Sequence, residues 1–152
     1  AAPASYATTP YFSNHAFRFV NAAGQGTWAR LVAEPAAGTV YLSPEAEASA
    51  PDTFLEDELK TRLQAGPVDF TLYAQPAAPG DSLTDPSQPW SEGGPAKVAL
   101  GRLRIQTLSA AENCDGLVFI PTQLPAGIEP ADDPILKARA AAYAVSAQRR
   151  KR

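Results

Sequence analysis

The segment "DDPILKARAAAYAV", residues 132–145, has the pattern of a helix with a defined start. Asp133 suits the capping position before a helix, and Pro134 suits its first turn because that turn leaves N–H groups unpaired. Residues four apart in a helix lie on the same face, so Arg139 and Tyr143 form a polar pair. The neighbours of this pair are almost all alanine, and their small size would let a large flat molecule approach closely.

One chemical role of an arginine beside a tyrosine is to prepare the tyrosine as a metal ligand. A fixed guanidinium favours the phenolate form of a tyrosine, both through its charge and through hydrogen bonding. An anionic oxygen suits ferric iron, and tyrosine is a known axial ligand of haem iron. From spacing alone, the simpler interpretation is that Arg139 and Tyr143 are a hydrogen-bonded or stacked pair on a helix near the end of the chain, so the sequence around them must decide.

The composition indicates a globular chain of ordinary domain size. The chain has 152 residues, 45% of them apolar, and its formal net charge of -3 excludes a dominant basic face for nucleic acid. No apolar run approaches the roughly 20 residues that span a bilayer, and no signal peptide is visible. The basic residues 149–152 form either a solvated tail or an anion contact. A single cysteine, Cys114, predicts no internal disulfide and leaves the cellular compartment undetermined.

Fifteen prolines and ten glycines divide the chain into short elements. Alternating apolar residues predict strands over 16–20, 27–33, 68–75 and 98–108. The first two strands form a hairpin around "NAAGQG", and the last has a bulge at Gly101. Antiparallel strands together with separate helices indicate the α+β class. Because four strands without a closing partner leave open sheet edges, the sheet is predicted to be part of a larger barrel or sandwich.

Two helices and two loops complete the predicted elements. The segment 51–67 predicts an inserted helix with Thr53 and Glu56 as a capping box, and the second helix is the one that follows Asp133. The loop over 76–97 contains an isolated tryptophan, Trp90, which is interpreted as a packing anchor. The segment 124–134 is predicted to be a proline-rich turn.

The region "FIPTQLPAGIEPADDPILKARAAAY" (119–143) closely resembles the part of haem catalases that leads into the proximal tyrosine. There, a Pro-x-Gly-Ile-Glu-Pro run precedes an acidic residue and an Arg-x-x-x-Tyr helix. The stretch "YFSNHAFRFVNAAGQGTWARL" (11–31) resembles the family's histidine-containing strand and hairpin, and "TDPSQPW" (84–90) and "ALGRLRI" (99–105) resemble its next loop and strand. Within the superfamily, 54–75 and the ending "AYAVS" are most similar to the small catalase-related peroxidases.

The resemblance implies roles for individual residues. Tyr143 matches the proximal ligand of the iron of haem b, and Arg139 matches the arginine that holds it as phenolate. Asp133 matches an acidic residue that pairs with this arginine, and His15 matches a strand histidine of the same network. The expected order is therefore His15–Asp133–Arg139–Tyr143, in which each group orients the next. The alternative for His15 is a satisfied histidine on a barrel wall, and capping by Asp133 is compatible with its network role.

The resemblance also extends to the end of the chain. Arg150 falls where the family places a basic contact to a haem propionate, with Arg149 as the fallback if the register slips by one. The alternative is that both arginines belong to a solvated tail.

The resemblance implies a fold that is part of an antiparallel catalase-type β-barrel with an inserted helix and a C-terminal haem-proximal helix. Residues 1–152 are expected to be a single partial domain, the C-terminal half of a haem domain. The chain begins at Ala1 and contains no methionine, so it is expected to be a processed chain or a fragment. The family's distal histidine and asparagine are expected in the missing half, because His15 is the single histidine and aligns with the proximal side.

The implied function is that of a haem-dependent peroxidase, which reduces hydrogen peroxide or organic peroxides and oxidises a small organic reductant. The full protein is expected to be a monomer or homodimer, and the present chain to have little turnover. One alternative is a haem-binding module without enzymatic activity. A second is a catalase-fold enzyme that rearranges fatty-acid hydroperoxides, and a third is a fragment that folds poorly and binds nothing.

Overall fold

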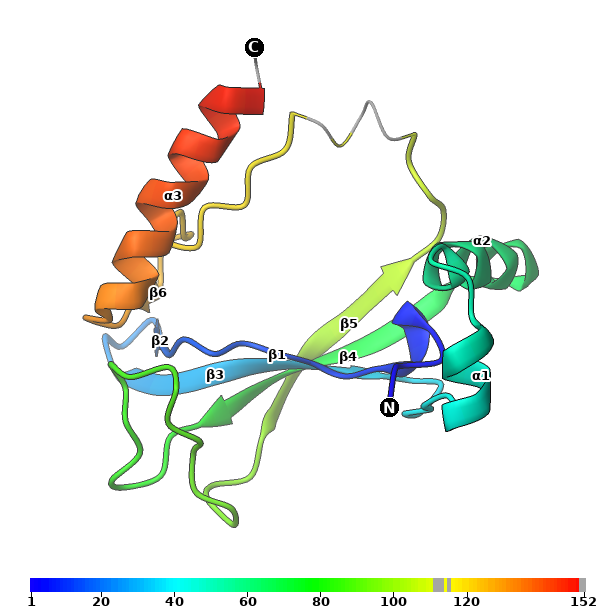
Figure 1. Ribbon diagram of the computed structural model, residues 1–152. Helices are drawn as coiled ribbons and strands as arrows, with labels where there is room; N and C mark the ends of the chain where they lie inside the picture. Colours follow the sequence, from blue (N-terminus) through cyan, green and yellow to red (C-terminus); the bar gives the residue numbers. More distant parts are fainter. Residues whose placement is uncertain (111–113, 115, 151–152) are drawn as a thin grey trace. The chain divides into compact units, whose positions relative to one another are not determined.

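The computed structural model describes residues 1–110, 114 and 116–150. Figure 1 shows helices combined with antiparallel strands, which confirms the α+β class. In chain order the elements are η1 (Tyr6–Thr8), β1 (Tyr11–Phe12), β2 (Phe17–Val20), β3 (Gly26–Pro35), α1 (Pro44–Ser49), α2 (Phe54–Ala65), β4 (Val68–Pro76), β5 (Val98–Ile105), β6 (Ile128–Pro130) and α3 (Pro134–Arg150).

The strands form one hydrogen-bonded sheet that is not closed among the described residues. Its order is β5-β4-β3-β2-β6, with β1 also paired to β3. The chain divides into two compact units: unit 1 holds 1–12, 32–73 and 99–108, and unit 2 holds 13–31, 74–98 and 109–152. All the candidate site residues named from the sequence belong to unit 2, whose elements therefore matter most for function. No helix in the described part of the chain is long and apolar enough to cross a membrane.

Unit 1 is built around a small apolar core beneath helix α2. Its buried residues are Ala7, Val68 and Phe70, and the α2 residues Leu59 and Leu63 pack against them. The helix therefore uses the leucine face that its spacing predicts. These contacts position α2 on the strand that follows it.

The predicted start of α2 is wrong in one detail. Thr53 makes no capping hydrogen bond to the backbone; its hydroxyl donates instead to Asp57 Oδ2 at 2.8 Å. The backbone of Thr53 has φ -93° and ψ 3°, outside the extended region in which a capping hydroxyl accepts from the N–H groups of the first turn. The helix itself forms within the predicted segment.

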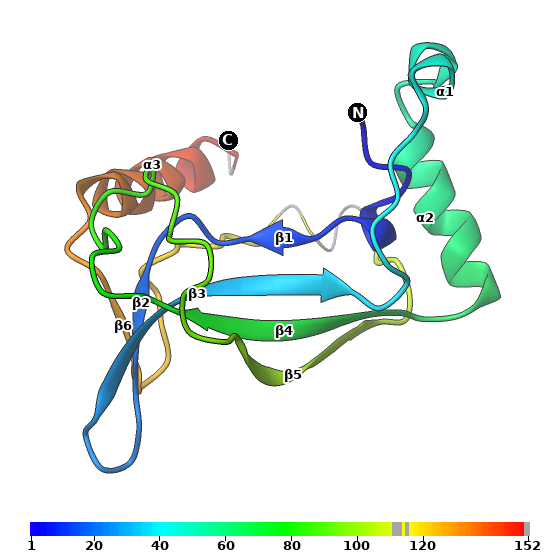
Figure 2. The same ribbon diagram turned by 90° about the horizontal axis from the view of Figure 1, so that it is seen from below.

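Unit 2 contains the predicted hairpin. Strand β2 pairs antiparallel with β3 in the register from Phe17↔Ala29 to Val20↔Gly26. In the turn, the Asn21 side chain accepts hydrogen bonds from the N–H groups of Ala23 and Gln25, at 3.0 and 2.9 Å. Figure 2 shows the two strands and the loop that joins them. The hairpin predicted around the segment 21–26 is therefore confirmed, and hydrogen bonds from the backbone to the Asn21 side chain hold its turn.

The segment 124–134 is more than a turn, which corrects the sequence-based prediction. Residues Ile128–Pro130 form strand β6, antiparallel to β2. Gly127 has a φ of 86°, which favours glycine, and its carbonyl accepts from Val20 N at 2.8 Å. A strand of three residues that ends in proline is too short to show an alternation of apolar and polar residues in the sequence. It forms because its backbone pairs with the edge of β2. Helix α3 begins at Pro134, with three residues between it and the end of β6.

The loop between β4 and β5 is anchored by Trp90, as predicted. The indole Nε1 donates to the Ser82 carbonyl at 2.8 Å, and the Arg30 guanidinium lies over the ring, 4.4 Å from its centre. The strand predicted over 98–108 forms as β5 but ends at Ile105, and the bulge at Gly101 stays a prediction. Three short elements, η1, β1 and α1, carry too few residues to be recognised from periodicity.

Candidate functional site

The first turn of α3 is held by a buried carboxylate. Asp133 Oδ1 accepts from the backbone N–H groups of Ile135 and Leu136, at 2.8 and 3.1 Å, which confirms the predicted cap. The second oxygen, Oδ2, lies 2.6 Å from His15 Nδ1. Asp133 is 1% exposed and Leu136 is fully buried beside it. One side chain therefore starts the helix and joins it to the β1–β2 segment.

His15 reaches this position because the chain bulges between β1 and β2. Strand β3 pairs Val32 with Phe12 and Ala29 with Phe17, so residues 13–16 face only residues 30–31. The surplus residues are pushed out of the ladder, which is how a bulge re-aims a side chain. His15 lies in this bulge and is 5% exposed.

Ser13 closes the bulge on the side of β3. Its backbone N–H donates to the Leu31 carbonyl at 2.8 Å, and its hydroxyl accepts from Leu31 N at 3.1 Å. The same hydroxyl donates to the His15 carbonyl at 2.8 Å. Ser13 therefore supplies the partners that the interrupted ladder lacks and fixes the backbone of His15. Nothing in the sequence pattern singles it out, since a serine two residues before a histidine has many possible roles.

Arg139 connects His15 to Tyr143. Its Nη1 lies 2.8 Å from His15 Nε2, and its Nη2 donates to the Tyr143 hydroxyl oxygen at 2.7 Å. A guanidinium has only donors, so His15 Nε2 must be an unprotonated acceptor. The imidazole proton is then on Nδ1, where it is donated to Asp133. His15 is thus neutral, and its tautomer is set by its two neighbours.

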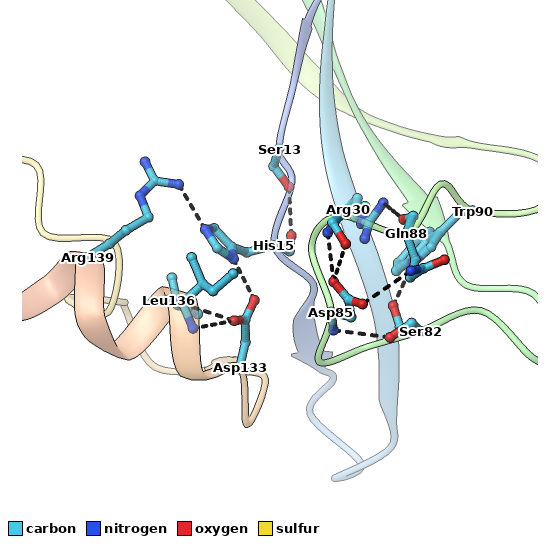
Figure 3. A network of polar contacts seen from close by, with 12 residues as sticks. Ser13, His15, Arg30, Ser82, Asp85, Gln88, Trp90, Asp133, Leu136 and Arg139 are labelled. Atoms are coloured by element: carbon cyan, nitrogen blue, oxygen red, sulfur yellow. Dashed lines mark hydrogen bonds and ion pairs between the residues drawn. The ribbon is translucent and has the colours of Figure 1, made fainter.

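The observed order of the network is Asp133–His15–Arg139–Tyr143, and Figure 3 shows its first three members. The order expected from the sequence has Asp133 next to Arg139, and the structure corrects this by placing His15 between them. The reason is the bulge: it inserts the imidazole at the helix start, where the carboxylate also caps α3. Spacing along α3 cannot show this, because His15 comes from a distant segment.

The Asp133 carboxylate is stabilised by its partners. Burial acts to raise the pKa of this carboxyl, but the His15 hydrogen bond and the N–H groups of Leu136 and Ile135 act in the opposite direction. The net pKa is lower than the ordinary value of an aspartate. Asp133 is therefore ionised at neutral pH and is the negative end of the network.

Tyr143 and Arg139 face a cavity of about 350 Å³ that lies within unit 2. Its apolar wall consists of Leu117, Val118, Phe119 and Pro121, and its polar groups come from α3: Arg139, Tyr143 and Arg150. The wall is unusually open to solvent, since Phe119 is 81% exposed. Large exposed apolar side chains next to convergent polar groups are typical of a ligand site.

Arg150 lies in the same cavity, two turns beyond Tyr143. Its guanidinium bonds Ser146 Oγ at 3.2 Å and the Leu117 carbonyl at 3.4 Å. The cavity thus contains Arg150 and not the fallback, Arg149. The structure brings together three predicted residues at the cavity, while His15 and Asp133 are buried behind Arg139. The last two residues of the basic tail lie outside the described part of the chain.

The fold is that of catalases. Catalase A from Saccharomyces cerevisiae superposes with a TM-score of 0.83 at 22% identity, covering 97% of this chain and 33% of that one. A fungal catalase gives 0.82 at 20% identity, with 97% and 32% coverage. The catalase-type fold expected from the resemblance is therefore confirmed, with the sheet open among the described residues.

The sequence comparisons define the family. The catalase family model matches residues 1–151. The catalase-related peroxidase of Mycolicibacterium paratuberculosis is 41% identical over 149 residues, which are 97% of this chain and 47% of that protein. The catalase-related peroxidase of Synechococcus elongatus is 35% identical over 151 residues, 99% of this chain and 44% of that protein. The chain belongs to the catalase family, and it spans less than half the length of these two relatives.

Proposed function

We propose that this chain carries the proximal half of the haem site of a catalase-family peroxidase, with Tyr143 as the axial ligand of the iron of haem b. The observation that carries the proposal is the 2.7 Å hydrogen bond from Arg139 Nη2 to the Tyr143 oxygen, at the edge of an apolar cavity. A guanidinium in this position favours the phenolate, which is the form of tyrosine that binds ferric iron.

The residues around the cavity fit a porphyrin. A porphyrin is large, flat and apolar with anionic propionates at one edge, and the cavity offers an exposed apolar wall that includes Leu117 and Phe119. Between Arg139 and Tyr143, α3 has only alanines, so no bulky side chain of that turn competes for the space. Arg150 would supply the positive charge for a propionate. The residues that line the cavity therefore suit haem in polarity and charge.

Each residue of the network has a defined part in the proposed site. Asp133 accepts a hydrogen bond from Nδ1 of His15 and fixes its tautomer, which leaves Nε2 as the acceptor for Arg139 Nη1. This contact orients the guanidinium so that its other amino group meets the phenol oxygen. Such outer contacts hold a metal ligand in position and adjust its basicity. Bound haem would supply the redox iron for peroxide chemistry.

For the whole protein, we propose the reduction of hydrogen peroxide or organic peroxides with a small organic molecule as electron donor, in a monomer or homodimer. The supporting observation is the identity of 41% and 35% to two proteins named catalase-related peroxidase. Peroxide cleavage needs a second base on the opposite side of the haem. His15, the single histidine of the sequence, is engaged behind Arg139, so we propose that this chain alone turns over little peroxide.

Haem titration of the chain tests the proposed site. Wild type and Tyr143→Phe are compared by visible absorption, with Tyr41→Phe as a matched control because Tyr41 is an exposed tyrosine of unit 1. We expect a phenolate-type ferric spectrum in wild type and in the control, its loss in Tyr143→Phe, and an affinity lower by about tenfold or more. Identical spectra and affinities in all three chains would reject Tyr143 as the ligand.

A further inference from the structure

Unit 2 has a second cavity, which shares no lining residue with the cavity at Tyr143. Its volume is about 350 Å³, and it is lined by the start of β3 and by the loop that follows β4. Strand β3 contributes Thr27 and Trp28, and the loop contributes Ala77, Ala78, Pro79, Gly80, Asp81 and Leu83. The proposed haem site uses none of these residues, so the cavity, here named the Trp28 cavity, has no role yet.

The loop side of the Trp28 cavity is fixed by backbone hydrogen bonds. Ala77 N donates to the Trp28 carbonyl at 2.9 Å, which ties the start of the loop to β3. Residues 78–81 form a β-turn, because the N–H of the last residue donates to the carbonyl of the first at 3.1 Å. Pro79 and Gly80 take the two central positions, and the φ of 95° at Gly80 is typical of glycine at the third position of a type II turn. The rim of the cavity is therefore preformed.

Asp81 is the charged group that lines the Trp28 cavity, and three hydrogen bonds hold its carboxylate. Oδ2 accepts from Ala78 N at 2.7 Å, and Oδ1 accepts from the N–H and the hydroxyl of Ser91, each at 2.8 Å. A carboxylate has about four lone-pair positions, so one position on Oδ2 is left for a further donor. Among the residues that the structure describes, Asp81 forms no ion pair. The cavity therefore offers an oriented anionic acceptor.

The Asp81 carboxylate keeps its negative charge at neutral pH. Burial acts to raise its pKa, but the hydrogen bonds from Ser91 and Ala78 and the charge of Arg30 act in the opposite direction, and the net pKa is below the ordinary value of an aspartate. Arg30 itself lies over Trp90 and donates to a backbone carbonyl of the loop, so it is engaged elsewhere. A cationic group of a ligand would thus find the carboxylate without a paired cation.

The other surfaces of the Trp28 cavity are apolar. Trp28 is half-buried, so part of its indole ring remains accessible, and Leu83 and Pro79 add aliphatic surface. An indole ring favours contact with a second aromatic ring, either stacked with an offset or edge-on. An aromatic surface beside a single carboxylate selects a ligand that combines a ring with a positive charge, whereas an anion would be repelled by Asp81.

We propose that the Trp28 cavity binds a small aromatic molecule that carries a protonated amino group. The ring packs against Trp28 and Leu83, and the amino group donates a charge-assisted hydrogen bond to Asp81. The turn at residues 78–81 holds the carboxylate in place before the ligand arrives, which lowers the cost of ordering on binding. This inference goes beyond the proposed function and does not depend on Tyr143 or on haem.

The two tryptophans of the chain make the proposal testable by NMR. A nitrogen-15-labelled, haem-free chain gives two indole N–H signals, and Trp28→Phe assigns the signal of Trp28 by removing it. Benzylamine, which is protonated at neutral pH, is titrated into the chain. Benzoate, which has a ring and a negative charge, and butylamine, which has the positive charge without a ring, are the comparison ligands.

We expect a saturable shift of the Trp28 signal with benzylamine and little change at Trp90, whose indole N–H is engaged with the Ser82 carbonyl. Benzoate and butylamine should bind at least about fivefold more weakly, because each lacks one of the two contacts. Absence of a saturable shift at Trp28, an equal shift at Trp90, or equal affinities for the three ligands would overturn the proposal.

Asp81→Asn should lower the benzylamine affinity by about fivefold or more, because it removes the charge. Asp85→Asn is the matched control: Asp85 lies on the same loop and also accepts three hydrogen bonds, but it does not line the cavity. It should keep the wild-type affinity, and equal losses in the two variants would reject Asp81 as the partner of the amino group.

Leu83→Lys gives a second test if Asp81→Asn does not fold. It leaves the hydrogen bonds of Asp81 in place and adds a positive charge to the cavity lining, so the same loss of benzylamine affinity is expected. Unchanged affinity in this variant would overturn the proposal. If neither variant folds, the three ligands compared on wild type decide, because equal affinities contradict a site that needs both ring and charge.

This proposal and the haem proposal can fail separately. Tyr143→Phe should bind benzylamine like wild type, since the two cavities have no lining residue in common. A loss of benzylamine binding in Tyr143→Phe would place the amine in the other cavity and overturn this inference. Haem binding that depends on Tyr143 without any benzylamine binding would reject the Trp28 cavity alone.

Discussion

Asp133 shows how one side chain can carry two local tasks. One oxygen caps α3 through two backbone N–H groups, and the other accepts a hydrogen bond from His15 Nδ1. An asparagine could keep the cap, but its amide nitrogen is a donor and would face the Nδ1 proton. His15 would then have to move its proton to Nε2, where the donors of Arg139 already point. The negative charge is therefore required by His15 more than by the helix.

The substitution Asp133→Asn is expected to lower the free energy of unfolding by about 2–4 kcal/mol at pH 7, because it leaves buried donors facing each other. Asp132→Asn is the matched control. Its carboxylate is the exposed partner of Lys137, so a change of less than about 1 kcal/mol is expected. Urea unfolding of the three chains measures both values.

The pH dependence of this difference has a defined sign. The folded state lowers the pKa of Asp133 below that of the unfolded chain, which is about 4. The stabilisation is therefore fully present above about pH 4 and is lost as the pH falls through the lower, folded value. The wild-type advantage over Asp133→Asn should be constant from pH 5 to 7 and shrink in acid. A difference that persists unchanged at pH 2 would contradict the assigned ionisation.

At the scale of elements, local signals predict well what local interactions decide. Asp133 and Pro134 mark the start of α3, the Asn21 turn marks the hairpin, and the leucine spacing marks α2. The pairing of β6 with β2 and the position of His15 depend on segments that are far apart in the sequence. Periodicity contains no information on such pairings. The resemblance to haem catalases named the candidate residues, whereas the order of their contacts required the structure.

The bulge before β2 is the element that delivers His15, and Ser13 is expected to stabilise it. Ser13→Ala would leave the Leu31 N–H and the His15 carbonyl without their partner, at a cost of about 1–3 kcal/mol. Hydrogen exchange at the Leu31 amide should become faster in proportion. Ser49→Ala is the control, because its hydroxyl bonds only exposed carbonyls of α1, and it should change stability by less than about 0.5 kcal/mol. Equal effects of the two substitutions would deny the bulge this role.

For the chain as a whole, strand β5 is the exposed end of the sheet. In the described residues it is the last strand of the sheet order, and its apolar side chains Val98, Leu100 and Leu103 are 55%, 48% and 52% exposed. Unpaired apolar edges promote association between chains. The isolated chain is expected to self-associate at high concentration.

Sedimentation velocity checks this expectation. Leu103→Lys places a charge on the edge and should shift the distribution toward monomer. Val40→Lys is the control, because Val40 is 47% exposed but lies outside the strands. Self-association that is unaffected by Leu103→Lys, or equally reduced by Val40→Lys, would place the contact elsewhere.

The distance in sequence between the members of the network has a consequence for the order of folding. Arg139 and Tyr143 are four residues apart, whereas His15 is 118 residues from Asp133 and 124 from Arg139. A loop of this length costs several kcal/mol of chain entropy to close, and such contacts form slowly. The helical pair can therefore exist early, while its alignment by His15 waits until both distant segments have met. The contact between His15 and Arg139 is therefore expected to form after the hydrogen bond between Arg139 and Tyr143, so the tyrosine is present on a formed helix before its arginine is oriented by the histidine.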